Sequence, residues 1–215
     1  MSVPPFPVYL FDIDGTLVDS AADICGAIQG ALASTRRKDV PFDVLKTYIG
    51  KHLNDLWRDL EFPPEEWDTL LTDYRRIYPE RKHASTRVYP GVREGLASIE
   101  GRKSTATTKG TPTTGMILEL FELAPYFDHV QGTDGFPAKP EPDVIFTALT
   151  ALGAKPEDCL FVGDSATDME AGRRAGVRTC AVTYGYGIRS EMEQWSPDYW
   201  IDDLRELGPN GKVSK

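Results

Sequence analysis

The segment FDIDGTLVDS, residues 11–20, places two carboxylates close together directly after a short apolar run. Asp12 and Asp14 follow Val8–Phe11, which has the pattern of a buried strand, and alternate positions on an extended chain project the same way. Two such acids repel each other unless a cation or a shared proton compensates. Gly15 then lets the backbone turn sharply or approach a ligand closely. This pattern favours acid–base or metal chemistry over an Asp-Gly turn that caps a helix, which needs only one acid.

A second acidic segment, LFVGDSATD at residues 160–168, has the same form. An apolar strand ends in glycine and is followed by Asp164 and Asp168 at the start of a helix. Because the carboxyl ends of parallel strands meet at one edge of a sheet, Asp164 and Asp12 can ligate one hard cation there. All-oxygen ligation favours Mg²⁺. The alternative is that Asp164 or Ser165 only caps the following helix.

Two further segments suit an anion such as phosphate. Thr107, Thr108 and Lys109 follow a weak β-branched strand and precede a helical stretch, where hydroxyl groups and helix-end amides bind anions. Lys139 stands just before a helix that begins with proline, and its compact cation can neutralise phosphate charge. A lysine by itself is most often an exposed surface residue, so only the combination of these segments predicts a phosphate site.

Strand and helix patterns alternate along the parts of the chain that must position these residues. Short apolar or β-branched runs predict strands at Val8–Phe11, Ser104–Thr107, around His129-Val130, and at Cys159–Val162, Thr179–Val182 and Tyr199–Ile201. Helical spacing lies between them, in the sets Val92, Leu96 and Ile99; Met116, Leu120 and Leu123; and Ile145, Leu149 and Leu152. This alternation predicts an α/β fold with a doubly wound parallel sheet.

One long stretch, residues 19–85, shows helical patterns only. Its three apolar stripes predict helices and begin at Ile24, Leu53 and Trp67. Helices inserted after the first strand are expected to form a cap, and Tyr89-Pro90-Gly91 is a turn signal where the chain returns. We therefore predict a core of residues 1–18 and 86–207, a helical cap of residues 19–85, and a mobile tail of residues 208–215.

The composition excludes several classes of protein. Lys and Arg total 24 against 33 Asp and Glu, a net charge of −9, so general binding to nucleic acid or to an anionic membrane surface is not expected. No apolar run approaches the roughly 18 residues of a membrane helix, and the N-terminus has no signal-peptide pattern. The three cysteines, Cys25, Cys159 and Cys180, form no CxxC pair. We expect a cytoplasmic location.

Taken in this order, the segments FDIDGTLVDS, ATTK, AKPEPD and VGDSATD resemble the motifs of the haloacid dehalogenase superfamily of phosphohydrolases. The resemblance extends over residues 6–205 and implies a Rossmann-like sheet core with an inserted α-helical cap. Within the superfamily the chain looks most like the phosphoglycolate phosphatases. Relatives usually carry Asn after the threonine of the second motif, whereas this chain has Thr108. One phosphate or backbone contact that the Asn would make is therefore not expected in the same form.

The resemblance implies a role for each motif residue. Asp12 would be the nucleophile that forms an aspartyl phosphate, and Asp14 would be the general acid and then the general base. Mg²⁺ would be bound by the Asp12 carboxylate, the Asp14 backbone carbonyl and the Asp164 carboxylate, with Asp168 in support. The phosphoryl group would be bound by Thr107, Thr108 and Lys139.

The function implied is that of a Mg²⁺-dependent phosphatase for a small phosphorylated metabolite, with 2-phosphoglycolate the first substrate to test, acting as a monomer or homodimer. Within the cap, Lys51 is a candidate contact for a second anionic group of the substrate, as are the arginines Arg75, Arg76 and Arg81; the alternative is an exposed helix face. A β-phosphoglucomutase-like phosphotransferase is the main alternative function. A receiver-like signalling domain needs neither Asp14 nor a cap, and a non-catalytic phosphate-binding module does not need all the motif residues.

Overall fold

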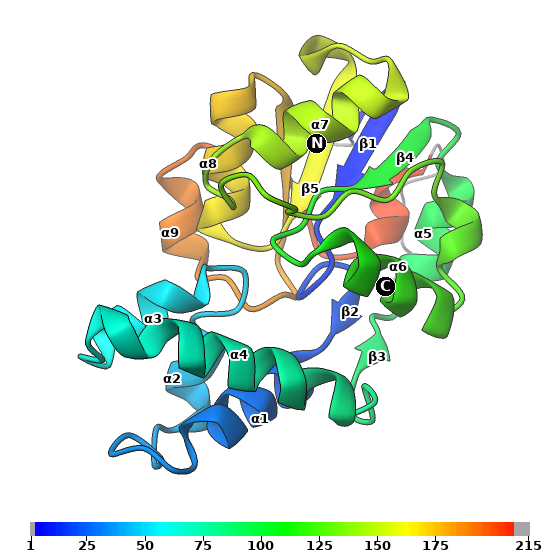
Figure 1. The fold of residues 1–215 in the computed structure, drawn as a ribbon. Coiled ribbons are helices and arrows are strands. Elements are labelled where there is room, and N and C mark those ends of the chain that lie inside the picture. The colour runs from blue at the N-terminus through cyan, green and yellow to red at the C-terminus, as the bar shows by residue number, and fades with distance from the viewer. Residues whose placement is uncertain (1–2, 209–215) are drawn as a thin grey trace.

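The computed structural model describes residues 3–208, and Figure 1 shows a sheet flanked by helices, with further helices beyond one end of its strands. Five parallel strands form the sheet in the order β4-β1-β5-β6-β7. Their bounds are β1 Val8–Phe11, β4 Arg102–Thr105, β5 Cys159–Gly163, β6 Arg178–Val182 and β7 Tyr199–Ile201. The predicted parallel α/β fold is confirmed. No helix within residues 3–208 is long and apolar enough to cross a membrane.

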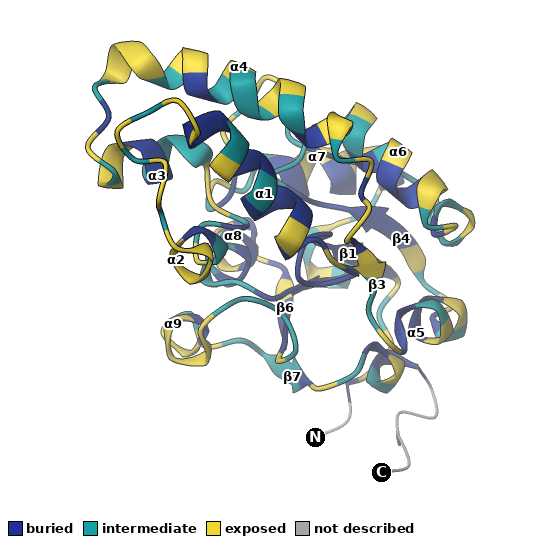
Figure 2. Ribbon diagram, turned by 90° about the horizontal axis from the view of Figure 1, so that it is seen from below, coloured by how far each residue is buried: buried dark blue, intermediate teal, exposed yellow. Residues whose placement is uncertain are grey.

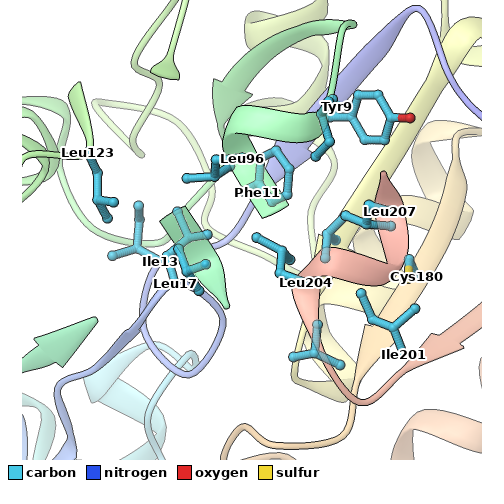
Figure 3. Packing of buried hydrophobic residues seen from close by; sticks show 14 of the residues in the cluster. Tyr9, Phe11, Ile13, Leu17, Leu96, Leu123, Cys180, Ile201, Leu204 and Leu207 are labelled. Carbon is cyan, nitrogen blue, oxygen red and sulfur yellow. The ribbon is translucent and has the colours of Figure 1, made fainter. Parts of the chain in front are cut away.

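Helices cover both faces of the sheet, which explains the continuous apolar sequence of its central strands. Tyr9 and Phe11 of β1 pack into one buried cluster, part of which Figure 3 shows, whereas Val8 and Leu10 pack into a second cluster. The helices of this part are α5 Val92–Ser98, α6 Thr111–Leu120, α7 Asp143–Leu152, α8 Ala166–Ala175 and α9 Arg189–Glu193. Short 3₁₀ helices lie at Ala124–Tyr126, Pro156–Asp158 and Leu204–Leu207.

The edge position of β4 accounts for its polar sequence. Thr105 is buried and donates its hydroxyl to the carbonyl of Gln131 at 2.8 Å, while the amide of Lys103 donates to the Asp128 carboxylate at 2.8 Å. The prediction of a strand around His129-Val130 is wrong, because only an isolated bridge joins His129 to Ser104. Most other contacts between this segment and β4 involve side chains, such as those of Thr105 and Asp128. The strand predicted at Ser104–Thr107 forms two residues earlier, at Arg102–Thr105.

The face predicted for α6 also differs from the structure. The helix forms, but Met116 and Leu120 are 51% and 54% exposed, while Ile117 and Leu118 are buried. A helix of this length carries two neighbouring apolar stripes in its sequence, and spacing alone does not decide which one faces the core. Figure 2 shows the resulting division of the helices into buried and exposed sides.

Four helices lie between two short strands that pair with each other, β2 Val18–Asp19 and β3 Arg87–Val88. They are α1 Ala21–Leu32, α2 Phe42–Lys46, α3 Leu53–Asp59 and α4 Pro64–Glu80. The predicted stripes correspond to α1, α3 and α4, whereas α2 is too short, and buries too little, to have shown a periodic pattern. We call these four helices, together with the loops that join them, the helical insert. They share a hydrophobic cluster of their own, centred on Leu56 and Trp57.

We predicted a core of residues 1–18 and 86–207 and a cap of residues 19–85, and this division stays a prediction. The chain leaves the core through β2 and returns through β3, and these two strands pair with each other. The predicted mobile tail of residues 208–215 lies outside the described residues, apart from Gly208. Gly208 is buried, and a Cβ there would lie 2.9 Å from the Cβ of Ser98.

Trp57 offers a test of how the helical insert is held together. Its side chain is fully buried, it meets Phe62 edge to face, and its indole N–H has no hydrogen-bond partner within residues 3–208. We expect Trp57→Ala to lower the free energy of unfolding by about 3–5 kcal/mol because a large cavity remains. Trp57→Phe removes the unpartnered N–H and less volume, so it should cost clearly less. Urea denaturation measures both, and equal losses would contradict this account.

Candidate active site

Parallel strands bring the two acidic segments to one edge of the sheet. In the register of β1, Phe11 lies level with Thr105 of β4 and with Val162 of β5. The backbone amide of Asp12 continues this pairing by donating to the Val162 carbonyl at 2.9 Å. The structure therefore brings together Asp12 and Asp164, as their position after neighbouring strands predicted. With Asp168 they offer carboxylate oxygens that all lie within 4.8 Å of one another.

Lys139 lies within this group of acids. Its Nζ donates to Asp12 Oδ1 at 2.7 Å, to Asp168 Oδ1 at 2.5 Å and to the carbonyl of Ala106 at 3.1 Å, which uses all three of its hydrogens. Burial would lower the pKa of Lys139, but the two carboxylates raise it above its ordinary value. Burial raises the pKa of Asp12 to about 6, against the lowering effect of Lys139. Lys139 is thus a fixed positive charge beside the predicted nucleophile.

Asp164 has polar partners but no cation. The Thr16 hydroxyl donates to its Oδ1 at 3.2 Å and the Tyr186 amide to its Oδ2 at 2.7 Å, and within residues 3–208 no Lys, Arg or His pairs with it. Burial and the neighbouring Asp168 raise the pKa of Asp164 well above its usual range. A buried carboxylate without a counter-charge is costly. Three buried acids around one lysine therefore fit a hard divalent cation, which Asp12, Asp164 and Asp168 would hold.

The turn after Asp12 depends on Gly15. This glycine has a φ of 90°, and a Cβ there would lie 2.6 Å from the Cγ of Asp164. A side chain at this position would therefore push Asp164 aside as well as strain the backbone. The sequence predicted that Gly15 allows a sharp turn or a close approach. In the structure, the group that lies close to Gly15 is the Asp164 carboxylate.

Asp14 lies in different surroundings from Asp12, and its carboxylate is not part of the three-acid group. Lys109 Nζ contacts Asp14 Oδ2 at 2.9 Å, and the Ser20 hydroxyl donates to Asp14 Oδ1 at 2.6 Å. Lys109 also donates to the hydroxyl of Tyr78, on α4 of the helical insert, at 3.3 Å. Burial would lower the pKa of Lys109, but Asp14 and Tyr78 raise it well above its ordinary value. Asp12 and Asp14 thus have separate cations.

A cavity of about 730 Å³ lies between the helical insert and the sheet edge. Asp14, Thr108 and Lys109 line it from the sheet side, and the insert contributes Tyr48, Lys51, Tyr74, Arg75 and Tyr78 among others. Its volume is typical of small-molecule sites. Thr107 is not among the lining residues; it is buried behind them, and its hydroxyl accepts from the Lys109 amide at 3.4 Å.

Of the cations predicted to meet a second anionic group, the structure places two at this cavity. Lys51 and Arg75 line it, and the Lys51 ammonium lies 5.4 Å from the centre of the Tyr48 ring. Arg76 instead pairs with Asp73 and Glu80, and Arg81 lies 3.3 Å from the buried carboxylate of Asp23. Arg76 and Arg81 therefore contact acidic residues of the helical insert and do not line the cavity.

Four residues contact the site without an individual role in the sequence prediction: Thr16, Ser20, Lys109, which was included only as part of an anion-binding segment, and Tyr186. A signal was available for three of them, because Thr16 and Ser20 stand inside FDIDGTLVDS and Lys109 ends ATTK. Tyr186 lies in none of the motif segments, and its contacts with Asp164 and with α1 depend on the loop after β6. No local pattern indicates such contacts.

The fold and the motif positions agree with comparisons to known proteins. The family model of haloacid dehalogenase-like hydrolases matches residues 9–182. This chain belongs to that family, and the predicted enzyme class, a phosphatase-type hydrolase of the superfamily, is confirmed.

Relatives match over nearly the whole chain. A protein of Pseudomonas aeruginosa named phosphoglycolate phosphatase 1 is 34% identical over 93% of this chain and 78% of its own length. One of Nitrosospira multiformis named phosphoglycolate phosphatase is 33% identical over 94% of both chains. The crystal structure of a predicted phosphatase from Clostridium acetobutylicum superposes with a TM-score of 0.87 at 28% identity, covering 95% of this chain and 97% of the other.

Replacing Lys139 tests the electrostatics of the site. Lys139→Met leaves Asp12 and Asp168 buried without their cation, so we expect the free energy of unfolding to fall by about 3–5 kcal/mol. Urea denaturation in chelator at neutral pH measures the loss. The double variant Asp12→Asn, Lys139→Met removes one of the stranded charges and should recover part of it. A loss in the double variant equal to or above that of Lys139→Met alone would contradict this account.

Proposed function

We propose that this protein is a Mg²⁺-dependent phosphatase that hydrolyses small phosphomonoesters through a phosphorylated Asp12. The observation that carries the proposal is the separation of two carboxylates only two residues apart. Asp12 is buried beside Lys139 in a three-acid group, whereas Asp14 faces the cavity and contacts Lys109. This separation supports a nucleophilic role for Asp12 and a proton-carrying role for Asp14, the two roles that a two-step transfer requires.

In the first step an Asp12 carboxylate oxygen bonds to phosphorus while the bond from phosphorus to the leaving oxygen breaks. The Lys139 ammonium, 2.7 Å from Asp12, reduces the repulsion between this carboxylate and the phosphate dianion. Thr107, Thr108 and Lys139 are proposed to bind the phosphoryl oxygens. Asp12, Asp164, Asp168 and the Asp14 carbonyl would hold Mg²⁺, which would supply positive charge to the phosphoryl group.

Asp14 moves the protons in both steps of the proposed reaction. It gives a proton to the leaving alkoxide oxygen, and it then takes one from the water that attacks the phosphorylated Asp12. This water forms the new bond to phosphorus, and inorganic phosphate leaves as the Asp12 carboxylate is restored. Ser20 and Lys109 hold the two oxygens of Asp14 in place.

Amide variants of the two carboxylates test these roles. Asp12→Asn should abolish phosphatase turnover while the far-ultraviolet circular dichroism stays that of the folded protein, since an amide is a poor nucleophile. Asp14→Asn should lower kcat by roughly 10²- to 10⁴-fold, the usual contribution of a general acid–base. Activity on a panel of phosphorylated metabolites, with Mg²⁺ and with chelator, measures both. Full activity of Asp12→Asn would refute the nucleophile assignment.

The substrate proposal is 2-phosphoglycolate, which the names of the relatives support. The cationic side chains of Lys51 and Arg75 at the cavity suit the carboxylate of such a substrate. A β-phosphoglucomutase-like transfer would return the phosphoryl group to a sugar, and product analysis with β-glucose 1-phosphate separates the two reactions. A cytoplasmic location, which the three free buried cysteines support, and a monomer or homodimer complete the proposal.

Lys51 gives the substrate proposal a direct test. Lys51→Ala should lower kcat/KM for 2-phosphoglycolate by about 10-fold, because an exposed charge pair contributes at most ~1 kcal/mol and partial burial under substrate adds to it. For a phosphomonoester whose alcohol part carries no charge, such as methyl phosphate, kcat/KM should fall little. Lys38→Ala, which changes an exposed lysine of the helical insert that does not line the cavity, is the control. An equal loss on both substrates would exclude a role for Lys51 in carboxylate binding.

A further inference from the structure

Tyr186 joins the site and the helical insert from a loop that belongs to neither acidic segment. It follows β6, and its backbone amide donates to Asp164 Oδ2 at 2.7 Å. Gly185 and Gly187 flank it, and a Cβ at Gly185 would lie 2.6 Å from the Cγ of Asp164. The ring, in contrast, packs against the hydrophobic cluster of the helical insert, with the Lys46 ammonium 5.1 Å from its centre.

The hydroxyl of Tyr186 makes three hydrogen bonds at the start of α1. It accepts from the backbone amides of Ser20 at 2.6 Å and Ala21 at 3.0 Å, and it donates to Asp19 Oδ1 at 2.8 Å. A phenol has one hydrogen to donate and two lone-pair positions to accept with, so this arrangement uses its full capacity. The hydroxyl therefore fits its place as a helix cap supplied from a distant loop.

The side chain of Ser20, the residue at which α1 begins, does not cap the helix. Ser20 is the N-cap residue of α1, a position where a serine hydroxyl ordinarily accepts from the first free amides of its own helix. Ser20 makes no such bond, and its hydroxyl donates to Asp14 at 2.6 Å instead. The Tyr186 hydroxyl instead binds the amides of Ser20 and Ala21, which fixes the backbone that carries the Ser20 hydroxyl.

We propose that Tyr186 is a positioning residue of the phosphatase reaction. Its hydroxyl holds the backbone amides of Ser20 and Ala21 at the start of α1, and this keeps the Ser20 hydroxyl on the proton-carrying carboxylate of Asp14. Its amide holds Asp164 at the same time, so one residue sets the position of both carboxylates. This inference rests on the proposed function, because it assigns Tyr186 to the reaction through Asp14.

Tyr186→Phe is the central variant, since it removes only the hydroxyl and keeps the ring and the amide. Without the phenol oxygen, the amides of Ser20 and Ala21 lose their acceptor, so the backbone at Ser20 shifts and its hydroxyl no longer holds Asp14 in place. We expect kcat on 2-phosphoglycolate, or on the best substrate of the panel, to fall roughly 10- to 100-fold with KM changed less than about 3-fold. Mg²⁺ affinity measured by calorimetry should change less than about 2-fold, because the contact with Asp164 is made by a backbone amide.

Two further measurements separate positioning from general damage to the fold. Amide hydrogen exchange at Ser20 and Ala21 should accelerate in Tyr186→Phe, whether or not substrate is present. In a Ser20→Ala background the same change should have little further effect on kcat, because residues that act through one another are not additive. Tyr9→Phe is the matched control: its buried hydroxyl accepts from the Phe6 amide at 2.9 Å near the opposite end of the sheet, and its loss should leave kcat unchanged.

Each of these measurements has a result that would overturn the proposed role of Tyr186. An active wild type with unchanged kcat in Tyr186→Phe overturns the positioning role alone, and a fully additive loss in the double variant overturns the route through Ser20. Unaltered exchange at Ser20 and Ala21 overturns the helix cap. A wild type inactive on every phosphomonoester with Mg²⁺ bound refutes the proposed function, and the role of Tyr186 in that reaction falls with it.

Discussion

Three carboxylates buried at one edge of a sheet repel each other, and much of the surrounding structure compensates for that repulsion. Lys139 gives all three of its hydrogens to this point, two of them to Asp12 and Asp168. Asp164 has only neutral donors, so the group keeps an excess of negative charge that suits a divalent cation. The parallel arrangement of β1 and β5 is what makes such a group possible, because it brings the ends of distant segments together.

The same chain gives two neighbouring carboxylates different surroundings. Asp12 lies in the three-acid group, where burial raises its pKa to about 6 against the effect of Lys139. Asp14 lies two residues further on, beyond the pairing of β1, and its partners come from the start of α1 and from the segment after β4. Carboxylates in distinct environments are suited to distinct tasks. The turn that begins after Asp12 therefore matters as much to the proposed reaction as the acids themselves.

Much of the fold was predictable because each central strand is buried on both faces and so has a continuous apolar sequence. Val8–Phe11 forms as predicted, and the strand predicted at Cys159–Val162 forms with one further residue, Gly163. The predictions failed where side chains rather than periodicity decide the structure. β4 is an edge strand whose threonine and lysine bond to a neighbouring loop, and that loop bridges at His129 without forming a strand. On α6, spacing predicted the helix but not the face that packs.

The site shows the same division between local and distant information. Asp12 and Asp164 follow strands directly, so their convergence is readable from the sequence once the sheet is known to be parallel. Lys109 and Tyr186 act across the border between the sheet and the helical insert, Lys109 through Tyr78 and Tyr186 through α1. A contact of this kind depends on how two separately packed parts meet, and no spacing along one segment encodes it.

Because of these contacts, Asp12 and Asp14 depend on the helical insert to different degrees. Asp12 and its cation are held by the strands and by the segment before α7, and the hydrogen bonds of Lys139 do not involve the insert. Asp14 is held by Ser20 at the first turn of α1 and by Lys109, which itself contacts α4. A displacement of the helical insert would therefore alter the contacts of Asp14 before those of Asp12. In the proposed reaction, proton transfer by Asp14, rather than attack by Asp12 on phosphorus, would then depend on a correctly formed cavity.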